Sequence, residues 1–588
     1  MDERYDAIVI GGGPGGSTAA AYLARLGHRV LLLERSAFPR HRIGESLLPS
    51  MMPVLEDFGL IPACREAGFV EKTGATFIWG KTREPWSIRF EDTEFLPASF
   101  AFHVERSVFD RILLDNARDA GAEVHNDTTV LGAIKEGDRI VGVTYRHNET
   151  GEVHSARGRF VVDASGSASV IGRDVSERRY DDKMRQLALY SYFDNVRRPQ
   201  DFRAGHIIIE SCPKGWFWFI PIDSDSLGEV SLGLVTGQEF REEISEKGTR
   251  AFFDEALAEA PYIRELIGPD AERSERMYGV RDWAYTCDRT AGPGYYLVGD
   301  AAAFLDPLLS TGVSLAMLAG YSASVCINSV LRDPEMETAA AGFYSNNYRQ
   351  MYEVTRDFLH YFYSGNGSAH RDEIFWTARK MLNFDDNIGA KQAFTFFINT
   401  IPGNPHPALS KQIPLFHRFM ENIAHPLEEM EGASGIRRVV DKTQDLKKAD
   451  RLADGDVPIV NGVLENTWRI DRESHSLAPV RGITFDRERP VFSSTSSWLL
   501  GRNVAELPDE AYRLLELVDG TSSWLSIVSR YAEEEGLTLD EGRARTSEIV
   551  APLLAGDYVL LRSRDRDGAE RAGRACSADH RAAVTAGE

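Results

Sequence analysis

The stretch YDAIVIGGGPGGSTAAAYLARLGHRVLLLE, residues 5–34, decides the fold. An apolar run at 5–10 ends in a glycine-rich turn at 11–16, an alanine-rich segment follows, and a second apolar run closes the stretch. This order is typical of strand, turn, helix and strand, with the crossover length that two parallel strands need. We therefore predict a βαβ unit at the start of an α/β protein.

Three glycines stand where a phosphate-binding turn requires them. One permits the tight turn, one lets the backbone approach a pyrophosphate, and one allows close packing of helix on strand. The helix that follows directs its N-terminal N–H groups toward the anion. Glu34 ends the second strand, where an acid can accept hydrogen bonds from ribose hydroxyls. A glycine-rich turn without a ligand is the alternative. The predicted dinucleotide-binding residues are Gly11, Gly13, Gly16, Ser17 and Glu34.

Elements far downstream indicate FAD rather than NAD. The strand YYLVGDAAA at 295–303 contains Gly299 and Asp300, and FAD proteins of the hydroxylase type use an aspartate there to bind the ribityl chain. VVDASG at 161–166 resembles the strand of that fold that returns to the dinucleotide. Arg106 opens a predicted helix where the fold places an arginine on the cofactor. Together they predict an FAD-binding Rossmann-type fold, hydroxylase-like (GR2), with an associated substrate sheet.

The composition argues against several other classes of protein. The 588 residues include 67 Lys and Arg against 89 Asp and Glu, a net charge of −22, so binding to nucleic acid or anionic lipid is not expected. Five scattered cysteines without a CxxC pair argue against a disulfide framework or a zinc module, and no metal site is predicted. Charged residues follow Met1, and no run of about 18 apolar residues is expected anywhere in the chain. We expect a cytoplasmic protein that does not enter a membrane.

The sequence pattern divides the chain into four parts. Residues 1–330 are predicted to form an interleaved core of FAD-binding domain and substrate sheet, and residues 331–450 a helical region. Three predicted helices and a strand within 451–561 have the order of a winged-helix-like module. Its third helix carries too few basic residues to favour DNA contact. Residues 562–588 are expected to form a disordered tail.

Two further features bear on what the flavin does. GWFWFIP at 215–221 places Trp216 and Trp218 two residues apart in a predicted strand, so that both point to the same face. Core packing alone is the alternative for this pair. Lys72 precedes a β-type run that should enter a buried sheet, which is unusual unless the lysine is exposed at the strand's start. A solvated lysine at a strand end is therefore the alternative for Lys72.

Together these features resemble the FAD-dependent halogenases, over roughly residues 1–360. They also resemble the longer subgroup that adds a C-terminal helical and winged-helix-like extension. The WxWxIP string that begins at Trp216 is the signature that separates halogenases from flavin hydroxylases on the same fold, and Lys72 falls on the family's catalytic lysine.

The resemblance also assigns roles to two loops. FPRHRIGESLLP at 38–49 matches the segment that wraps the isoalloxazine ring, and DPLLSTG at 306–312 matches the loop whose Thr-Gly amides hold the halide. The implied cofactor-binding residues in and after these loops are Arg42, Glu45, Ser46, Gly312 and Val313. The implied chloride site is Thr311 and Gly312, and the implied partition between flavin and substrate is Trp216, Trp218, Ile220 and Pro221.

One position departs from the pattern of free-tryptophan halogenases. Those enzymes carry a glutamate two residues before the threonine of the halide loop, where this chain has Leu309. The absence of that acid resembles the branch that chlorinates phenols, pyrroles or activated carbonyl carbons, often while the substrate is tethered to a carrier protein.

The resemblance implies an oxidoreductase of natural-product (antibiotic) biosynthesis. It would use FADH2 from a separate flavin reductase, O2 and chloride, and would chlorinate its substrate through hypochlorous acid and Lys72. The expected substrate is a small aromatic or acyl group, free or on an acyl or peptidyl carrier protein. A flavin monooxygenase on the same fold is the first alternative, which WxWxIP and Lys72 argue against. A non-catalytic FAD-binding interaction protein is the second, which the intact motifs argue against.

Overall fold

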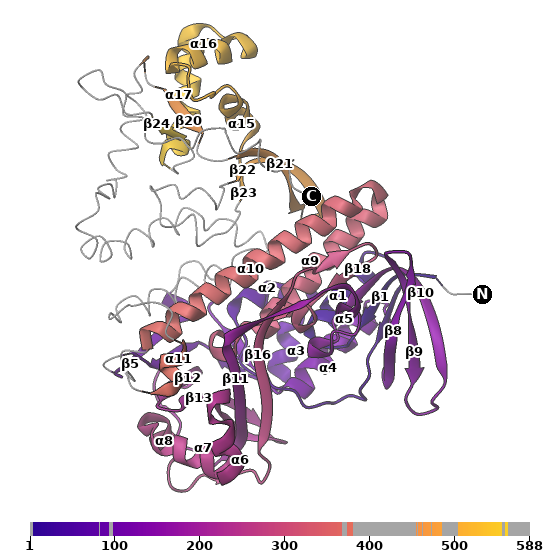
Figure 1. The fold of residues 1–588 in the computed structure, drawn as a ribbon, viewed down its shortest axis with the longest axis vertical. Helices are drawn as coiled ribbons and strands as arrows, with labels where there is room; N and C mark the ends of the chain where they lie inside the picture. The colour runs from indigo at the N-terminus through magenta and orange to yellow at the C-terminus, as the bar shows by residue number, and fades with distance from the viewer. Residues whose placement is uncertain are drawn as a thin grey trace, which may run out of the picture. The chain divides into compact units, whose positions relative to one another are not determined.

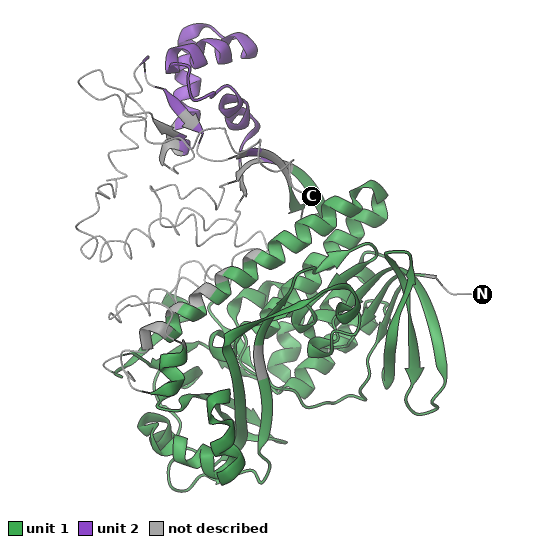
Figure 2. Ribbon diagram, in the orientation of Figure 1, with its two compact units in different colours: residues 1–430, 468–479, 498–501 green, residues 431–467, 480–497, 502–588 purple. Residues whose placement is uncertain are grey.

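The computed structural model shows two compact units (Figure 2). Unit 1 comprises residues 1–430, 468–479 and 498–501, and unit 2 comprises residues 431–467, 480–497 and 502–588. The structure describes residues 4–80, 83–92, 98–366, 373–379, 454–455, 457–460, 463–471, 473–484, 504–555 and 559–561. Residues 380–450 of the predicted helical region and the predicted tail at 562–588 lie outside the described residues.

Unit 1 begins with a sheet whose central strands are parallel (Figure 1). β1 pairs in parallel with β2 and β10, and β10 pairs in parallel with β18. Residues 7–10 and 30–33 are buried without alternation, because both faces of a parallel sheet are covered. The predicted βαβ unit is confirmed. The strands are β1 (Arg4–Ile10), β2 (Val30–Leu33), β7 (Glu123–His125), β8 (Thr128–Glu136), β9 (Arg139–His147), β10 (Val153–Asp163), β17 (Ala291–Gly292) and β18 (Tyr295–Leu297).

Helix α1 (Pro14–Arg25) follows the glycine turn and packs against α4 (Arg106–Asp119) and α9 (Gly312–Arg332). Two glycines permit its close contact with α9. A Cβ on Gly15 would lie 2.9 Å from the carbonyl oxygen of Ala316, and a Cβ on Gly320 would lie 2.3 Å from that of Gly15. The two helices therefore approach at backbone distance, which fixes α9 relative to the glycine turn.

Helix α9 corrects one expectation from the sequence. Gly312–Arg332 is long and apolar enough to cross a membrane by length and composition alone. Small polar residues such as Ser314 and Ser322 interrupt its apolar residues, so its sequence has no continuous apolar run. Most of this helix is buried inside the protein, so α9 is a core helix of unit 1.

A second, largely antiparallel sheet forms the other half of unit 1. One face of β13 contributes Trp216 and Trp218 to the main core, while Phe217 and Phe219 on the other face pack in a separate core. The strands, in spatial order, are β19 (Ala303–Phe304), β16 (Tyr278–Cys287), β11 (Arg178–Asp194), β14 (Gly228–Gly237), β13 (Gly215–Ser224), β12 (His206–Cys212), β4 (Gly74–Ile78) and β5 (Pro85–Arg89), and β15 (Glu272–Arg273) pairs with β11.

Shorter elements and one long helix complete unit 1. The long helix α10 (Glu337–Asn366) packs against α9 and contributes aromatic side chains to the main core, among them Tyr344, Tyr348, Tyr352, Phe362 and Tyr363. The other elements are β3 (Val70–Lys72), β6 (Ala101–His103), α2 (Met52–Phe58), α3 (Ile61–Glu66), α5 (Gly172–Val175), α6 (Arg241–Lys247), α7 (Thr249–Ala258), α8 (Pro261–Ile267) and α11 (Ile374–Arg379), with 3-10 turns η1 (Pro49–Met51), η2 (Phe90–Asp92), η3 (Gly166–Ala168), η4 (Gln238–Phe240), η5 (Gly299–Ala301), η6 (Pro307–Leu309) and η7 (Pro334–Met336).

Unit 2 contains three helices and short strands. The helices α15 (Asp509–Glu516), α16 (Trp524–Glu535) and α17 (Leu539–Ala555) enclose small cores of their own, and β20 (Pro458–Val460) pairs antiparallel with β24 (Val559–Leu561). β21 (Val463–Asp471) and β22 (Ser476–Thr484) are shared between the units, and β23 (Val504–Glu506) pairs with β22. The winged-helix-like character of this unit stays a prediction.

Candidate active site

The glycine turn has no room for side chains at two of its predicted positions. Gly11 has a φ of +100°, and a Cβ on it would lie 2.5 Å from the carbonyl oxygen of Ala164. A Cβ on Gly16 would lie 1.9 Å from the carbonyl oxygen of Gly11. Since Ala164 belongs to the VVDASG segment, that segment meets the turn directly. The turn therefore presents bare backbone and the N-terminus of α1 to a ligand.

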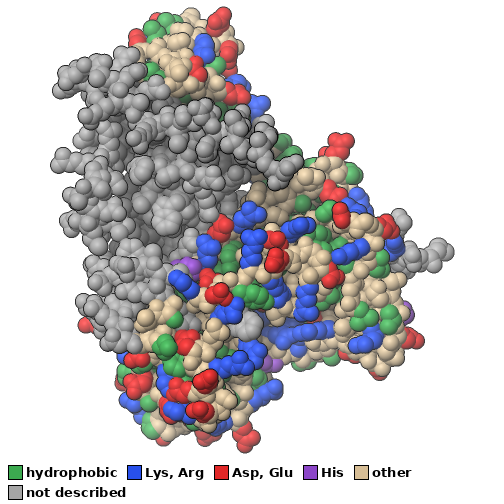
Figure 3. Space-filling view, in the orientation of Figure 1, with side chains coloured by type: hydrophobic (Ala, Val, Ile, Leu, Met, Phe, Trp, Pro, Cys, Tyr) green, Lys and Arg blue, Asp and Glu red, His purple; other side chains and the backbone are tan. Residues whose placement is uncertain are grey.

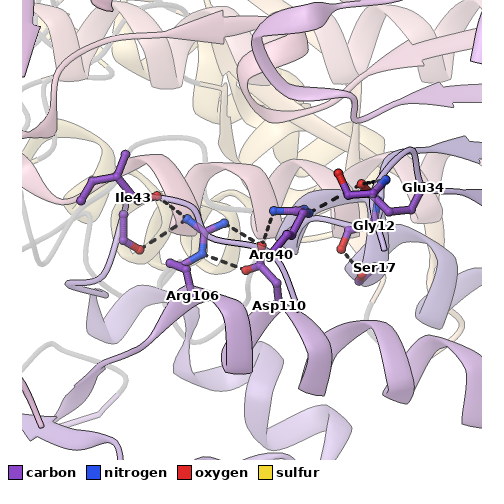
Figure 4. A network of polar contacts seen from close by, with 9 residues as sticks. Gly12, Ser17, Glu34, Arg40, Ile43, Arg106 and Asp110 are labelled. Atoms are coloured by element: carbon purple, nitrogen blue, oxygen red, sulfur yellow. Dashed lines mark hydrogen bonds and ion pairs between the residues drawn. The ribbon is translucent and has the colours of Figure 1, made fainter. Parts of the chain in front are cut away.

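A chain of charged groups continues from the turn, as Figure 4 shows. The Glu34 carboxylate accepts a hydrogen bond from the Gly12 N–H over 2.7 Å, and its other oxygen lies 3.6 Å from Arg40 Nε. Arg40 also donates to Asp110 over 3.1 Å. Asp110 in turn accepts two bonds from Arg106, over 2.8 and 3.0 Å. This network joins the acid predicted to bind ribose to the arginine that opens α4.

Arg40 and Asp110 are site residues that the sequence analysis did not identify. A Cβ on Gly13 would lie 3.4 Å from Arg40 Nη2, so this guanidinium lies directly over the glycine turn. Arg42, the arginine named from the sequence, is exposed. The signal for Asp110 was its position one helical turn after Arg106, where the two side chains meet on one face of a helix.

The flavin loop, residues 38–49, meets Arg106 and α9 at one point. Arg106 donates to the carbonyl oxygen of Ile43 over 2.7 Å. A Cβ on Gly44 would lie 2.8 Å from Arg106 Nη1 and 3.5 Å from a methyl group of Val313. The structure thus brings together three features that were predicted separately: the flavin loop, Arg106 and the start of α9.

Glu45 is a buried carboxyl group in the flavin loop. It is 1% exposed, and the Tyr192 hydroxyl donates to it over 2.7 Å. His41 Nε2 lies 2.8 Å from the same hydroxyl. Burial raises the pKa of Glu45 to about 7, against the lowering effect of its hydrogen bonds with Ser231 and Tyr192. The carboxyl group is therefore poised to gain or lose a proton near neutral pH.

The donors around the turn and the flavin loop fit FAD. A phosphate suits the α1 N-terminus and the Arg40 guanidinium, and a ribose suits the Glu34 carboxylate. The hydroxyls of Ser46 and Ser314 are buried with no protein partner, so a ligand's polar groups can complete their hydrogen bonds. Gly299 has a φ of +63° and precedes the half-buried Asp300 in η5.

Lys72 is buried at the end of β3, with 1% of its surface exposed. Its ammonium or amine group donates to the carbonyl oxygen of Leu47, in the flavin loop, over 2.9 Å. The Phe90 ring centroid lies 5.8 Å from Nζ. Burial lowers the pKa of Lys72 to about 7. Near neutral pH about half of the protein molecules therefore carry Lys72 as the nucleophilic free amine. The alternative of a solvated lysine at a strand end is wrong.

The tryptophan pair lies on the face of β13 that the sequence pattern predicted. Trp216 and Trp218 are 1% and 4% exposed, with ring centroids 6.3 Å apart, and Ile220 and Pro221 are buried behind them. Trp218 Nε1 donates to Ser231 over 3.2 Å. Its paired residue on β14 is Gly233, where a Cβ would lie 2.0 Å from the indole. Glycine there lets the indole lie across the neighbouring strand.

Valine in place of Gly233 is expected to displace the Trp218 indole, because the added side chain overlaps the ring. Overpacking of this kind costs about 1–3 kcal/mol of stability, which urea unfolding measures. Gly279→Ala in β16 is the matched control, since its Cβ would meet only ordinary contacts at 3.7 Å. Equal effects of the two substitutions would contradict the role given to Gly233.

The predicted halide loop precedes α9. Asp306 Oδ1 accepts the Leu308 N–H over 2.8 Å and so caps η6. Ser310 has a φ of +56°, and Thr311, 2% exposed, stands at the N-cap of α9. The first N–H groups of a helix have no partner within it, so those of Gly312 and Val313 are suited to an anion.

Among the described residues, no hydrogen bond joins Lys72 directly to the loop at 306–312. The flavin loop links them, because Leu47 accepts from Lys72 while Gly44 packs beside Val313. Leu309, the departure from the free-tryptophan pattern, is fully buried within η6. The flavin loop thus contacts both the buried amine of Lys72 and the start of α9.

The chain is similar to several known proteins. A model of the tryptophan halogenase family matches residues 6–96 and 91–396. A tryptophan 2-halogenase of Chondromyces crocatus is 34% identical over 64% of this chain and 70% of its own. A 1H-pyrrole-2-carbonyl-peptidyl-carrier-protein chlorinase of Pseudomonas fluorescens is 29% identical over 62% of this chain and 85% of its own. The solved structure of CmlS, a flavin-dependent halogenase, is 28% identical with a TM-score of 0.70, covering 96% of this chain and 97% of that one.

Proposed function

The chain belongs to the flavin-dependent halogenases, and on that premise we propose that it chlorinates an electron-rich small molecule, free or tethered to a carrier protein, through hypochlorous acid and Lys72. The observation that carries the proposal is the buried Lys72 amine, hydrogen-bonded to the flavin loop at Leu47. Burial of a lysine lowers the stability of the fold, because burial disfavours its charged form. A lysine that is kept in such a position therefore points to a functional role.

The cofactor of this family is FAD, and reduced FAD with O2 supplies the oxidising power for halide chemistry. The chain's own residues bind and orient it. Glu34, Arg40 and the α1 N-terminus would hold the adenosine and phosphate half, and Arg106 fixes the backbone of the flavin loop at Ile43. Thr311 and Gly312 would hold chloride at the N-terminus of α9.

Lys72 would act on the oxidant after chloride has been oxidised. Its neutral amine can take the chlorine of hypochlorous acid to form a chloramine with release of water, or can hydrogen-bond the acid. An electron-rich carbon of the substrate then takes the chlorine. The proton that leaves this carbon returns to the Lys72 nitrogen in the chloramine route, and leaves with the oxygen as water when the acid is only hydrogen-bonded. Trp216 and Trp218 would form the wall that separates the flavin from the substrate, which favours transfer through Lys72 over direct hydroxylation.

The partners would be a separate flavin reductase and, for a tethered substrate, an acidic carrier protein, with the enzyme in the cytoplasm. The net charge of −22 opposes docking of an acidic partner, so a local basic face is needed. Figure 3 shows Lys and Arg side chains gathered on one face of unit 1, over the region of β11, β16 and α10. Arg179, Lys183 and Arg281 are exposed basic residues of these two strands.

Reconstitution tests the proposed function. The purified protein is supplied with FAD, NADH, an unrelated flavin reductase, chloride and a panel of phenols and pyrroles, free or as carrier thioesters. Chlorinated product is expected by mass, and it should vanish without the reductase or without chloride. The glycine turn and Glu34 are committed to FAD, so the protein alone should not oxidise NADH. Rapid NADH oxidation by the protein alone, with an oxygenated product, would favour a monooxygenase.

The chlorination rate is expected to rise with pH through about 7 and then to level off. Burial lowers the pKa of Lys72 from 10.5 to about 7, and only the neutral amine reacts with hypochlorous acid. Below that pKa the neutral fraction falls by about tenfold per pH unit. The measurement is single-turnover product formation with flavin oxidation followed separately. Glu45 also titrates near 7, so Glu45→Gln serves as the control that removes it. A rate that falls as pH rises through 7 would contradict the neutral-lysine requirement.

A further inference from the structure

One tyrosine hydroxyl joins the tryptophan pair to the halide loop. Tyr363, buried in α10, donates to Asp306 Oδ2 over 2.9 Å. Its hydroxyl accepts the indole N–H of Trp216 over 2.8 Å and an amide N–H of Gln186 over 3.0 Å. A hydroxyl has one proton to donate and two lone pairs to accept with. The hydroxyl proton has a second acceptor within reach, Gln186 Oε1 at 3.3 Å, which is farther away than Asp306 Oδ2.

Asp306, which accepts the hydrogen bond from Tyr363, shapes the halide loop. Asp306 is 4% exposed, and its Oδ1 already caps η6 through the Leu308 N–H. Its Oδ2 is the atom that Tyr363 holds. Since η6 leads directly through Ser310 to Thr311, a rotation of this carboxylate would move the start of α9 and its free N–H groups.

We propose that Tyr363 is a positioning residue for the halide, which couples Trp216 to the loop at 306–312. The inference rests on the proposed function, because it takes this loop as the halide site. The hydroxyl fixes the position of the Thr311 and Gly312 amides relative to the Trp216 side chain. It does so from a helix that lies outside both the nucleotide sheet and the substrate sheet.

Direct action of the Tyr363 hydroxyl on substrate is the competing role, and the geometry argues against it. The Asp306 carboxyl group is the nearer of two acceptors for the hydroxyl proton, so a substrate oxygen would have to displace this bond. The ring is enclosed by other aromatic side chains, with centroid distances of 5.9 Å to Trp376, 6.1 Å to Phe375 and 6.2 Å to Trp79.

Tyr363→Phe tests the proposal, because it removes the hydroxyl and keeps the ring. The apparent KM for chloride is expected to rise about tenfold, equivalent to about 1.4 kcal/mol. The kcat at saturating chloride and the affinity for FAD should stay within about twofold, which is the range left by small local rearrangement. Asp306→Asn should give the same rise, and the double variant no more than either single one, since both remove one bond.

Tyr344→Phe is the matched control, because Tyr344 lies on the same helix and also loses one buried hydrogen bond, from its hydroxyl to the carbonyl oxygen of Leu297. It should lower stability without changing the KM for chloride. A rise in KM for chloride in this control, equal to that of Tyr363→Phe, would overturn the proposal. So would a Tyr363→Phe variant that changes only the KM for the organic substrate.

A readout without turnover separates this inference from the proposed function. The indole N–H resonance of Trp216 is followed in the FAD-loaded, oxidised protein during titration with chloride. It is expected to shift in the wild type and Tyr344→Phe, and not in Tyr363→Phe. No shift in the wild type would overturn the coupling. A shift in a wild type that makes no chlorinated product would instead overturn the proposed function alone.

Discussion

Lys72→Ala is expected to lower the yield of chlorinated product by about a thousandfold or more, the scale of loss for a residue that acts on the reacting atoms. FAD binding and flavin oxidation should remain, because the hydrogen bond from the lysine to the flavin loop goes to a backbone carbonyl, that of Leu47. Free hypochlorous acid or peroxide should accumulate instead. Product mass and a chlorine-trapping assay measure the two quantities.

Companion variants make this result specific to the amine. Lys72→Met keeps a side chain of similar length and should be equally inactive. Lys72→Arg should also be inactive, since a guanidinium stays charged at every usable pH. Lys135→Ala, which removes an exposed lysine bonded to the Asp174 carbonyl, is the control that should leave activity unchanged. Near wild-type chlorination by the alanine or methionine variant would show that Lys72 has no part in the chemistry.

Free tryptophan is expected to be chlorinated at least about a hundredfold more slowly than a matched electron-rich phenol, pyrrole or enolisable acyl group, the contribution typical of a positioned acid or base. An indole benzo-ring carbon is a modest nucleophile, so a nearby carboxylate would assist the oxidant or remove the ring proton. Leu309 can do neither. A phenolate or an enolate supplies its own electron density. The measurement compares tryptophan with the phenol, each free and as a carrier thioester.

A carboxylate from elsewhere in the sequence could take the place of the missing glutamate. The structure shows that two candidate acids already have hydrogen-bond partners. Asp306, three residues before Leu309, is already bonded to the Leu308 N–H and to Tyr363. Glu45 is held by Tyr192 within the flavin loop. Efficient chlorination of free tryptophan would contradict the prediction and would require one of these acids, or one outside the described residues, to act on the indole.

The parts of the site that the sequence predicted are those encoded by short, local patterns. The glycine turn, Glu34 and the tryptophan pair follow from spacing within a single βαβ unit or strand, so their faces could be derived from periodicity. Recognition of the flavin loop and the halide loop required a family resemblance, because neither loop has a periodic pattern of its own.

The remaining features depend on contacts between distant segments, which spacing does not encode. The burial of Lys72 depends on the pairing of β3 with β6 and on the flavin loop that covers it. The position of the Arg40 guanidinium above the glycine turn is set by the path of one loop. Tyr363 lies 57 residues from Asp306 and 147 from Trp216, so no local pattern could relate them.

The origin of the new atom in the product tests the central claim most directly. Turnover is run with an unrelated flavin reductase, chloride and heavy-isotope O2, and the product of the best substrate is analysed by mass. The expected product contains chlorine from the added chloride and no heavy oxygen, because the oxygen leaves as water when chlorine is transferred. A product that contains heavy oxygen and forms equally well without chloride would contradict the account and identify a monooxygenase on the same fold.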